Sequence, residues 1–300
     1  MNLRKNLDVF VPLLFSLAVS IPLGFTVWTA FFWIGPWVGG SMSLGSAISK
    51  RGGPEALDLG RRLSLILLVP LFLVFFGFMQ RENMQIEETV FYTAYFLSTA
   101  VFTRCLIHFA VAKVVGPLIW GRGFCGWVCW IAAVLEWLPI KENKPIPKRL
   151  TYIRISVLIV SLGIPLALIF GGYDYLNKHI YGDFGQVIQT NKFDQLIFFI
   201  VSTSVYYAAG IVLAFVFRKK RAFCKIACPV SLVMKAQTRI ALIRYSKPSG
   251  AACTDCGACS RSCPMDVDVA SYIRRGKAVT STECVACGIC RTVCPQGAIA

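Results

Sequence analysis

Eight of the thirteen cysteines lie in the last fifty residues and form two copies of one pattern. Both copies read C-x2-C-x2-C-x3-C-P, the first ending at Pro264 and the second at Pro295. In such a run, three closely spaced thiolates bind one [4Fe–4S] cluster and the fourth cysteine binds the other cluster. The spacing therefore predicts two clusters, one held by Cys253, Cys256, Cys259 and Cys294, and the other by Cys284, Cys287, Cys290 and Cys263.

Two other uses of these cysteines explain the pattern less well. Disulfides would leave the regular spacing and the two prolines unexplained, and zinc sites built from C-x2-C pairs would leave four cysteines over. A segment this short buries little apolar surface, so the clusters must replace a core. We therefore expect the segment to unfold when its iron is removed.

A second cysteine pattern occurs twice in the middle of the chain. Residues 122–129 read RGFCGWVC and residues 221–228 read RAFCKIAC, so both are R-x-F-C-x3-C and both follow an apolar stretch. Recurrence of one frame about a hundred residues apart indicates an internal duplication. Cysteines four apart share a helix face, so the two pairs can offer four thiolates to a third metal or cluster site: Cys125, Cys129, Cys224 and Cys228.

The nature of this third site stays open at the level of sequence. Thiolates suit iron–sulfur clusters and Cu(I) equally well, and a redox dithiol is a further alternative. The same four cysteines could also pack simply as small apolar side chains at helix ends.

The composition is that of an integral membrane protein. Hydrophobic residues make up 56% of the 300 residues and charged residues only 15%, whereas a soluble domain carries about a quarter charged residues. Mean hydropathy is +0.63, and apolar runs are long enough to cross a bilayer. The net charge of +16 comes largely from basic residues beside these runs, which favours membrane flanks over nucleic-acid binding.

These runs predict an all-α polytopic membrane bundle of five or six transmembrane helices, followed by a small C-terminal α+β domain of the bacterial 2[4Fe–4S] ferredoxin type. The uncharged stretch 9–49 contains Gly35, Pro36 and Gly39, which we expect to interrupt it; it supplies one or two spans. The other spans are expected at 63–79, 90–120, 152–171 and 195–217. Three parts follow: an N-terminal transmembrane region 1–89, a transmembrane core 90–247 with the two cysteine repeats, and the ferredoxin-type domain 248–300.

The distribution of basic residues predicts the orientation in the cell (inner) membrane. The segments 50–62, 121–149 and 218–247 are basic, and cytoplasmic flanks carry such an excess. The C-terminal domain then lies on the cytoplasmic side, which agrees with the reducing conditions that free thiolates need.

Paired C-x3-C motifs after apolar spans, followed by a two-cluster ferredoxin tail, resemble the NapH/NosR family of membrane-bound ferredoxin-type proteins, which includes the MauN-type proteins. The resemblance covers about residues 90–300. It implies oxidation of quinol and onward electron transfer, with the iron–sulfur domain in the cytoplasm. The family's repeats read C-x3-C-P; here Pro229 follows the second pair but Trp130 follows the first.

The sequence therefore predicts an electron-transfer protein, a subunit of an oxidoreductase of the quinol dehydrogenase type, that relays electrons between the quinone pool and a partner redox protein. The alternatives are a membrane factor that handles or reduces copper and a redox-sensing regulator. No nucleophile–base constellation indicates catalytic residues. His108, within the span 90–120, is a candidate for a hydrogen bond inside the bundle or for contact with quinone. Because no second intramembrane histidine exists, no haem is expected.

Overall fold

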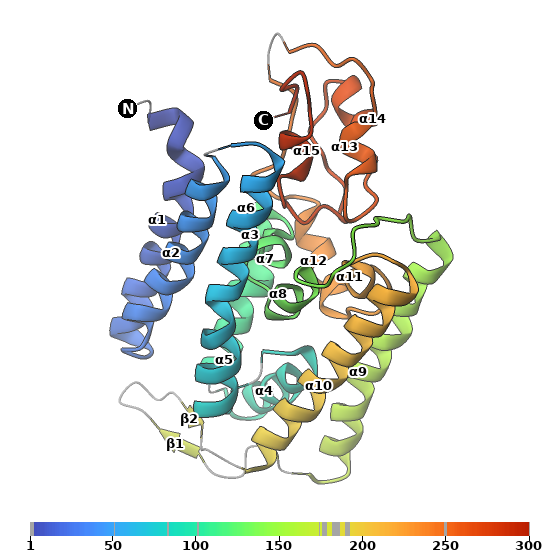
Figure 1. Ribbon diagram of the computed structural model, residues 1–300. Coiled ribbons are helices and arrows are strands. Elements are labelled where there is room, and N and C mark those ends of the chain that lie inside the picture. Colours follow the sequence, from blue (N-terminus) through green and yellow to red (C-terminus); the bar gives the residue numbers. More distant parts are fainter. Residues whose placement is uncertain are drawn as a thin grey trace.

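The computed structural model describes all residues except 1, 2, 51, 83, 101, 174, 176–178, 182–186, 190–192, 249–250 and 300. Long helices lie side by side, and the C-terminal segment covers one end of them (Figure 1). The N-terminus is drawn at the same end as this segment, and a two-stranded antiparallel hairpin lies at the opposite end, formed by β1 (His179–Tyr181) and β2 (Val187–Gln189). Most of the predicted outer loop 173–193 falls outside the described residues.

Within the described residues, four helical segments are long and apolar enough to cross a membrane: Val9–Thr26, Glu55–Met79, Lys148–Phe170 and Phe193–Val216. They correspond to α1 (Leu3–Thr26), to α3 (Pro54–Val69) continued by η1 (Pro70–Met79), to η3 (Lys148–Tyr152) with α9 (Ile153–Phe170), and to α10 (Phe193–Val216). The bundle is thus confirmed as mostly helical, while the total of five or six spans stays a prediction.

The first uncharged stretch breaks at a different place from the one predicted. The chain turns at residues 27–30, and α2 (Phe31–Ser49) runs without interruption through Gly35, Pro36 and Gly39. A methyl group added at Gly35 or Gly39 would collide with a serine side chain of α1. These two glycines therefore allow α1 and α2 to pack closely, and they do not end a helix.

The predicted single span 90–120 is two helical segments. Helix α4 (Ile86–Thr99) ends because Ala100 adopts a left-handed backbone conformation, with φ 59°. A new helix then begins, in which the Thr103 hydroxyl accepts a hydrogen bond from the Leu106 amide at 3.3 Å, a regular N-cap. It runs as α5 (Arg104–Ala110), η2 (Val111–Val115) and α6 (Gly116–Trp120).

Short helices close the end of the bundle beneath the C-terminal segment (Figure 1). They are α7 (Gly123–Trp127), α8 (Trp130–Glu136), α11 (Ala222–Ile226) and α12 (Val230–Thr238). The C-terminal segment itself contains α13 (Ala258–Arg261), α14 (Val269–Arg274) and α15 (Ile289–Thr292). The described residues of this segment, 248 and 251–299, contain no strand, so the predicted α+β character is not confirmed.

Candidate iron–sulfur sites

The two halves of the C-terminal segment fold in the same way around their cysteines. Asp255 and Ala286 occupy equivalent positions and both adopt left-handed conformations, with φ 54° and 49°. Gly257 and Gly288 follow with φ 69° and 82°, and each precedes a short helix. These turns require residues that tolerate positive φ, and glycine does so without steric cost. The sequence repeat is therefore also a repeat of backbone geometry.

The fourth cysteine of each motif has the same surroundings. The Val267 amide donates to Cys263 Sγ at 3.4 Å, and the Ala298 amide donates to Cys294 Sγ at 3.3 Å. Amide donors directed at sulfur stabilise negative charge on a thiolate. They are a standard way in which a protein tunes an iron–sulfur cluster.

The predicted ligands fall into two spatial groups. Cys253, Cys256, Cys259 and Cys294 line one small cavity together with Ile273 and other apolar side chains. In the second group, burial and then the neighbouring Cys287 and Cys263 raise the pKa of the Cys284 thiol to about 12. Cys290 interacts with Cys287, Cys284 and Cys263 as well. Each group thus offers four sulfur donors, and a metal must displace the thiol protons to bind there.

The R-x-F-C-x3-C repeats also share one geometry. In the first, the Val128 and Cys129 amides donate to the Phe124 carbonyl oxygen at 2.9 and 3.0 Å. In the second, the Ala227 and Cys228 amides donate to the Phe223 carbonyl oxygen at the same two distances. The two copies therefore form the same short helix and the same turn, as an internal duplication predicts.

The four cysteines of these repeats come together at the end of the bundle. Cys228 interacts electrostatically with Cys224, Cys125 and Cys129, and Cys125 Sγ lies 3.8 Å from the sulfur of Met234. Burial raises the pKa of Cys224 to about 11, although Arg221 opposes this effect. Four thiolates here would therefore need positive charge close by, from neighbouring cationic side chains or from a bound metal or cluster.

Across the described part of the chain, no three His, Cys, Asp or Glu side chains approach closely enough to hold a single metal ion. A cubane cluster requires a wider spacing of its ligands, because each cysteine binds a different iron atom. The donor set is all sulfur at each of the three groups, which is the set that iron–sulfur clusters use.

Buried cations surround the four cysteines of the repeats, called the membrane-face cysteines below: Cys125, Cys129, Cys224 and Cys228. Arg221 donates to the Cys125 carbonyl oxygen at 2.6 Å, and the Lys113 ammonium lies 3.1 Å from the centroid of the Phe124 ring. Arg122 is fully buried. Among the described residues, Arg122 Nε and Nη2 and Arg221 Nη2 have no hydrogen-bond partner. Buried donors of this kind favour an anionic group at the site, and a cubane with four thiolates is such a group.

Ion pairs fasten the C-terminal segment to the bundle. Glu283 pairs with Arg122 at 2.9 Å, Arg154 at 2.7 Å and Lys235 at 2.6 Å. On the other side of the same cysteine group, Asp266 pairs with two lysines, Lys219 and Lys225. Glu283 precedes Cys284 and Asp266 follows Cys263, so the second cysteine group is the one held against the bundle.

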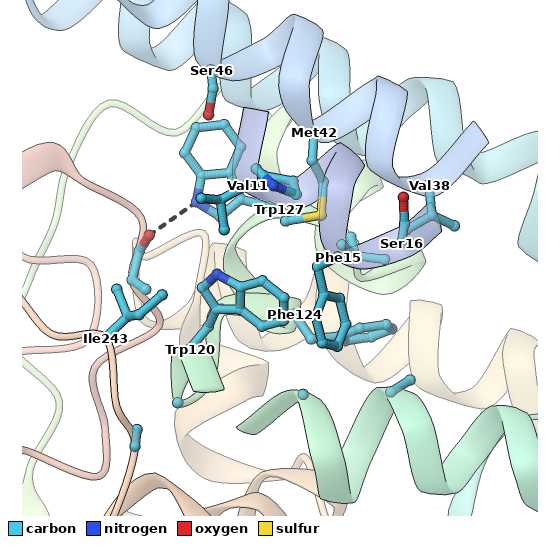
Figure 2. Close-up of a pocket in the computed structure, with 18 of the residues that line it drawn as sticks. Val11, Phe15, Ser16, Val38, Met42, Ser46, Trp120, Phe124, Trp127 and Ile243 are labelled. Carbon is cyan, nitrogen blue, oxygen red and sulfur yellow. Dashed lines mark hydrogen bonds between the residues drawn. The ribbon is translucent and has the colours of Figure 1, made fainter. Parts of the chain in front are cut away.

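Hydrogen bonds and close packing strengthen the same contact. The Trp127 indole donates to the Ala286 carbonyl oxygen at 2.9 Å, a bond drawn as a dashed line in Figure 2. A methyl group added at Gly126 would collide with the Val285 carbonyl oxygen. Residues of the first repeat therefore touch the second ferredoxin motif directly, and Cys125, Cys224, Cys287 and Cys290 belong to one buried cluster.

Sequence reasoning identified the cysteines and the repeat arginines but missed their partners. These partners do not belong to any recognisable motif: Glu136, Glu283, Asp266 and Lys113. Lys113 could have been suspected, because a charged residue within an apolar span is a functional candidate. His108, named as a candidate, has Glu82 beside it, with Nδ1 3.3 Å from Oε2.

The docking contact should weaken in acid. Although burial alone would raise it, Arg154, Arg122 and Lys235 hold the pKa of Glu283 well below its ordinary value. A depressed carboxyl pKa stabilises the docked state fully above the usual value of about 4.3, and this contribution is lost as the pH falls further. We expect Glu283→Gln to lower the midpoint of thermal unfolding at pH 7 and the difference from wild type to shrink below about pH 4. A difference that is constant with pH would contradict the ionised state of Glu283.

Two families of known domains match parts of this chain. The 4Fe–4S dicluster domain family matches residues 252–299, and a 4Fe–4S binding domain family matches residues 106–145 and 198–241. These matches cover all three cysteine groups. The chain thus joins 4Fe–4S binding domains to helices that can span a membrane.

One known protein that this chain resembles is the Escherichia coli (strain K12) protein named "Putative electron transport protein YccM". It is 22% identical over 172 residues, which are 55% of this chain and 47% of that protein. The chain therefore spans about half the length of this relative. No solved structure matches the chain.

Proposed function

We propose that this protein is a membrane-bound iron–sulfur electron carrier that relays electrons between the quinone pool and a partner redox protein. The observation that carries the proposal is the position of the second ferredoxin motif directly on the repeat that holds Cys125 and Cys129. Three groups of sulfur donors then follow one another from the far side of the C-terminal segment to the end of the bundle. The 4Fe–4S domain matches and the name of the E. coli relative support this class of function.

The proposed ligands are the three cysteine groups. One [4Fe–4S] cluster is assigned to Cys253, Cys256, Cys259 and Cys294, and a second to Cys284, Cys287, Cys290 and Cys263. A third is assigned to Cys125, Cys129, Cys224 and Cys228, because the 4Fe–4S binding domain family matches both repeats. When bound, such clusters supply reversible one-electron transfer.

The chain's own residues set the conditions for that transfer. Arg122 and Arg221 place positive charge beside the membrane-face cysteines, which favours the more negative, reduced state. Ion pairs of Glu283 and Asp266 fix the distance between the second motif and the bundle. Apolar packing around the membrane-face cysteines and the second ferredoxin motif excludes water and keeps the local dielectric low.

The proposed location is the cell (inner) membrane, with the C-terminal segment in the cytoplasm. The four spanning segments support a membrane location, and the excess of basic residues at the end that carries this segment supports the orientation. The protein would act as an electron-transfer subunit of an oxidoreductase whose remaining subunits bind the final donor or acceptor.

The proposal is tested by reduction under anaerobic conditions. Purified protein in detergent is mixed with ubiquinol or menaquinol, and reduction of the clusters is followed by EPR and by bleaching of their visible absorbance. We expect reduction within milliseconds to seconds, and the extent at equilibrium should follow the quinol-to-quinone ratio. Dithionite provides the control for full reduction. The relay would be contradicted if dithionite reduces the clusters but quinol does not, and if the reduced clusters do not pass electrons to quinone.

A further inference from the structure

A large apolar cavity lies between the first two helices and the rest of the bundle. Its volume is about 810 Å³, and side chains of α1, α2 and the 104–127 region line it. In Figure 2, Phe15 of α1 and Met42 of α2 lie beside Trp120, Phe124 and Trp127. The Phe15 and Trp120 rings are in contact, with centroids 4.6 Å apart. The cavity extends from His108 inside the bundle to Cys284 in the C-terminal segment.

His108 gives this apolar cavity a buried polar group. The side chain is 6% exposed and lines the cavity. Its Nδ1 atom faces the Glu82 carboxylate, which in turn pairs with Arg104 at 2.8 Å. With Nδ1 directed at the carboxylate, Nε2 is the ring nitrogen left to face a ligand. Among the described residues, Nε2 has no hydrogen-bond partner, and neither has the buried Ser20 hydroxyl on the same cavity.

Aromatic rings surround His108 and connect it with the cysteine repeats. Phe31 and Phe76 have ring centroids 4.8 and 4.7 Å from that of the imidazole. From Phe76 a further step of 6.1 Å between ring centroids reaches Phe72, and Phe72 lies 5.1 Å from Trp130, the neighbour of Cys129 in sequence. The histidine end of the cavity is thus only three ring-to-ring steps from the proposed third cluster.

From these contacts we infer that the cavity is the binding site for an isoprenoid quinone, with the quinone ring against His108 and the tail along α1 and α2. This inference rests on the proposed function, because it names the place where the quinone pool meets the protein. A ring oxygen of the quinone or quinol would hydrogen-bond with Nε2, and Phe31 and Phe76 would flank the ring. A phospholipid acyl chain fits the apolar walls equally well, but it would leave Nε2 and the Ser20 hydroxyl unpaired.

The inference is tested by direct binding of quinone. Ubiquinone and menaquinone with short isoprenoid tails are titrated into wild type, His108→Phe and Met42→Trp, and binding is followed by quenching of tryptophan fluorescence. We expect an at least ten-fold weaker affinity in both variants, since the first removes the imidazole that hydrogen-bonds the ring and the second fills the space for the tail. His179→Phe, which changes the only other histidine, serves as the matched control and should bind as wild type does. Iron content and reduction by dithionite show that each variant is folded and loaded.

The possible failures are distinguishable. If His108→Phe and Met42→Trp bind quinone as wild type does and quinol still reduces their clusters, the site is wrong while the relay stands. If wild type takes up only phospholipid and binds no quinone, the site is wrong as well. If binding depends on His108 but quinol never reduces the clusters, the site stands and the proposed relay is wrong.

Discussion

Replacing Cys125 or Cys224 by serine is expected to lower the iron content from about twelve to about eight atoms per chain. Both residues are buried at the meeting point of the two repeats. Serine is a poor ligand for iron in a cubane, so the third cluster would be lost or bound weakly. The eight cysteines of the C-terminal segment are unchanged, and its two clusters should remain. Iron analysis combined with an EPR redox titration measures both quantities in one sample.

Cys105 provides the matched control for this experiment. It is also a buried cysteine of the bundle, but it belongs to neither repeat, so Cys105→Ser should retain all the iron. Loss of one cluster should also interrupt the path from quinol to the C-terminal segment, and we expect reduction by quinol to slow by at least an order of magnitude. Wild-type protein with only about eight irons per chain would contradict a third cubane. Stoichiometric Cu(I) at Cys125 and Cys224 would instead favour the copper-handling alternative.

The cysteine motifs could be recognised in the sequence because their residues recur at short, regular spacings. Three of the four proposed ligands of one cluster, Cys253, Cys256 and Cys259, lie close together in sequence, so this pattern can be recognised without any knowledge of the fold. The duplication of the R-x-F-C-x3-C frame is local in the same sense. Its two copies adopt the same hydrogen bonds around Phe124 and Phe223, as the repeat predicts.

The residues that hold these local units together could not be found in this way. Glu283 is 129 residues from Arg154, and Glu136 is 85 residues from Arg221; such pairs depend on how the helices pack. The predicted helix boundaries were wrong for a related reason. Ala100 ends α4 and Pro36 does not end α2, because tertiary packing overrides the local preference of a residue.

The second large effect is expected from Glu136→Gln. Glu136 lies between two buried arginines, with its Oε1 2.7 Å from Arg61 and 2.6 Å from Arg221. Although burial alone would raise it, these two guanidiniums hold the pKa of Glu136 far below its usual range, so it is ionised at pH 7. Glutamine keeps the shape but removes the charge, which leaves the buried Arg221 without this counter-charge and Arg61 with only the more exposed Asp58, 3.1 Å away. Removing one partner of such a buried pair costs about 3–5 kcal/mol.

The consequence should reach the cysteines, because Arg221 also donates to the Cys125 carbonyl oxygen at 2.6 Å. We expect Glu136→Gln to lower the unfolding midpoint in detergent and to release the membrane-face cluster before those of the C-terminal segment. Glu142→Gln is the matched control: Glu142 pairs with Lys144 and Arg218, but all three are exposed, and such pairs contribute at most about 1 kcal/mol. Equal midpoints for the two variants would mean that the Arg61–Glu136–Arg221 group does not support the site. The order of cluster loss then decides between a purely structural ion pair and one that positions the ligands: only a positioning role makes the membrane-face cluster the first to leave.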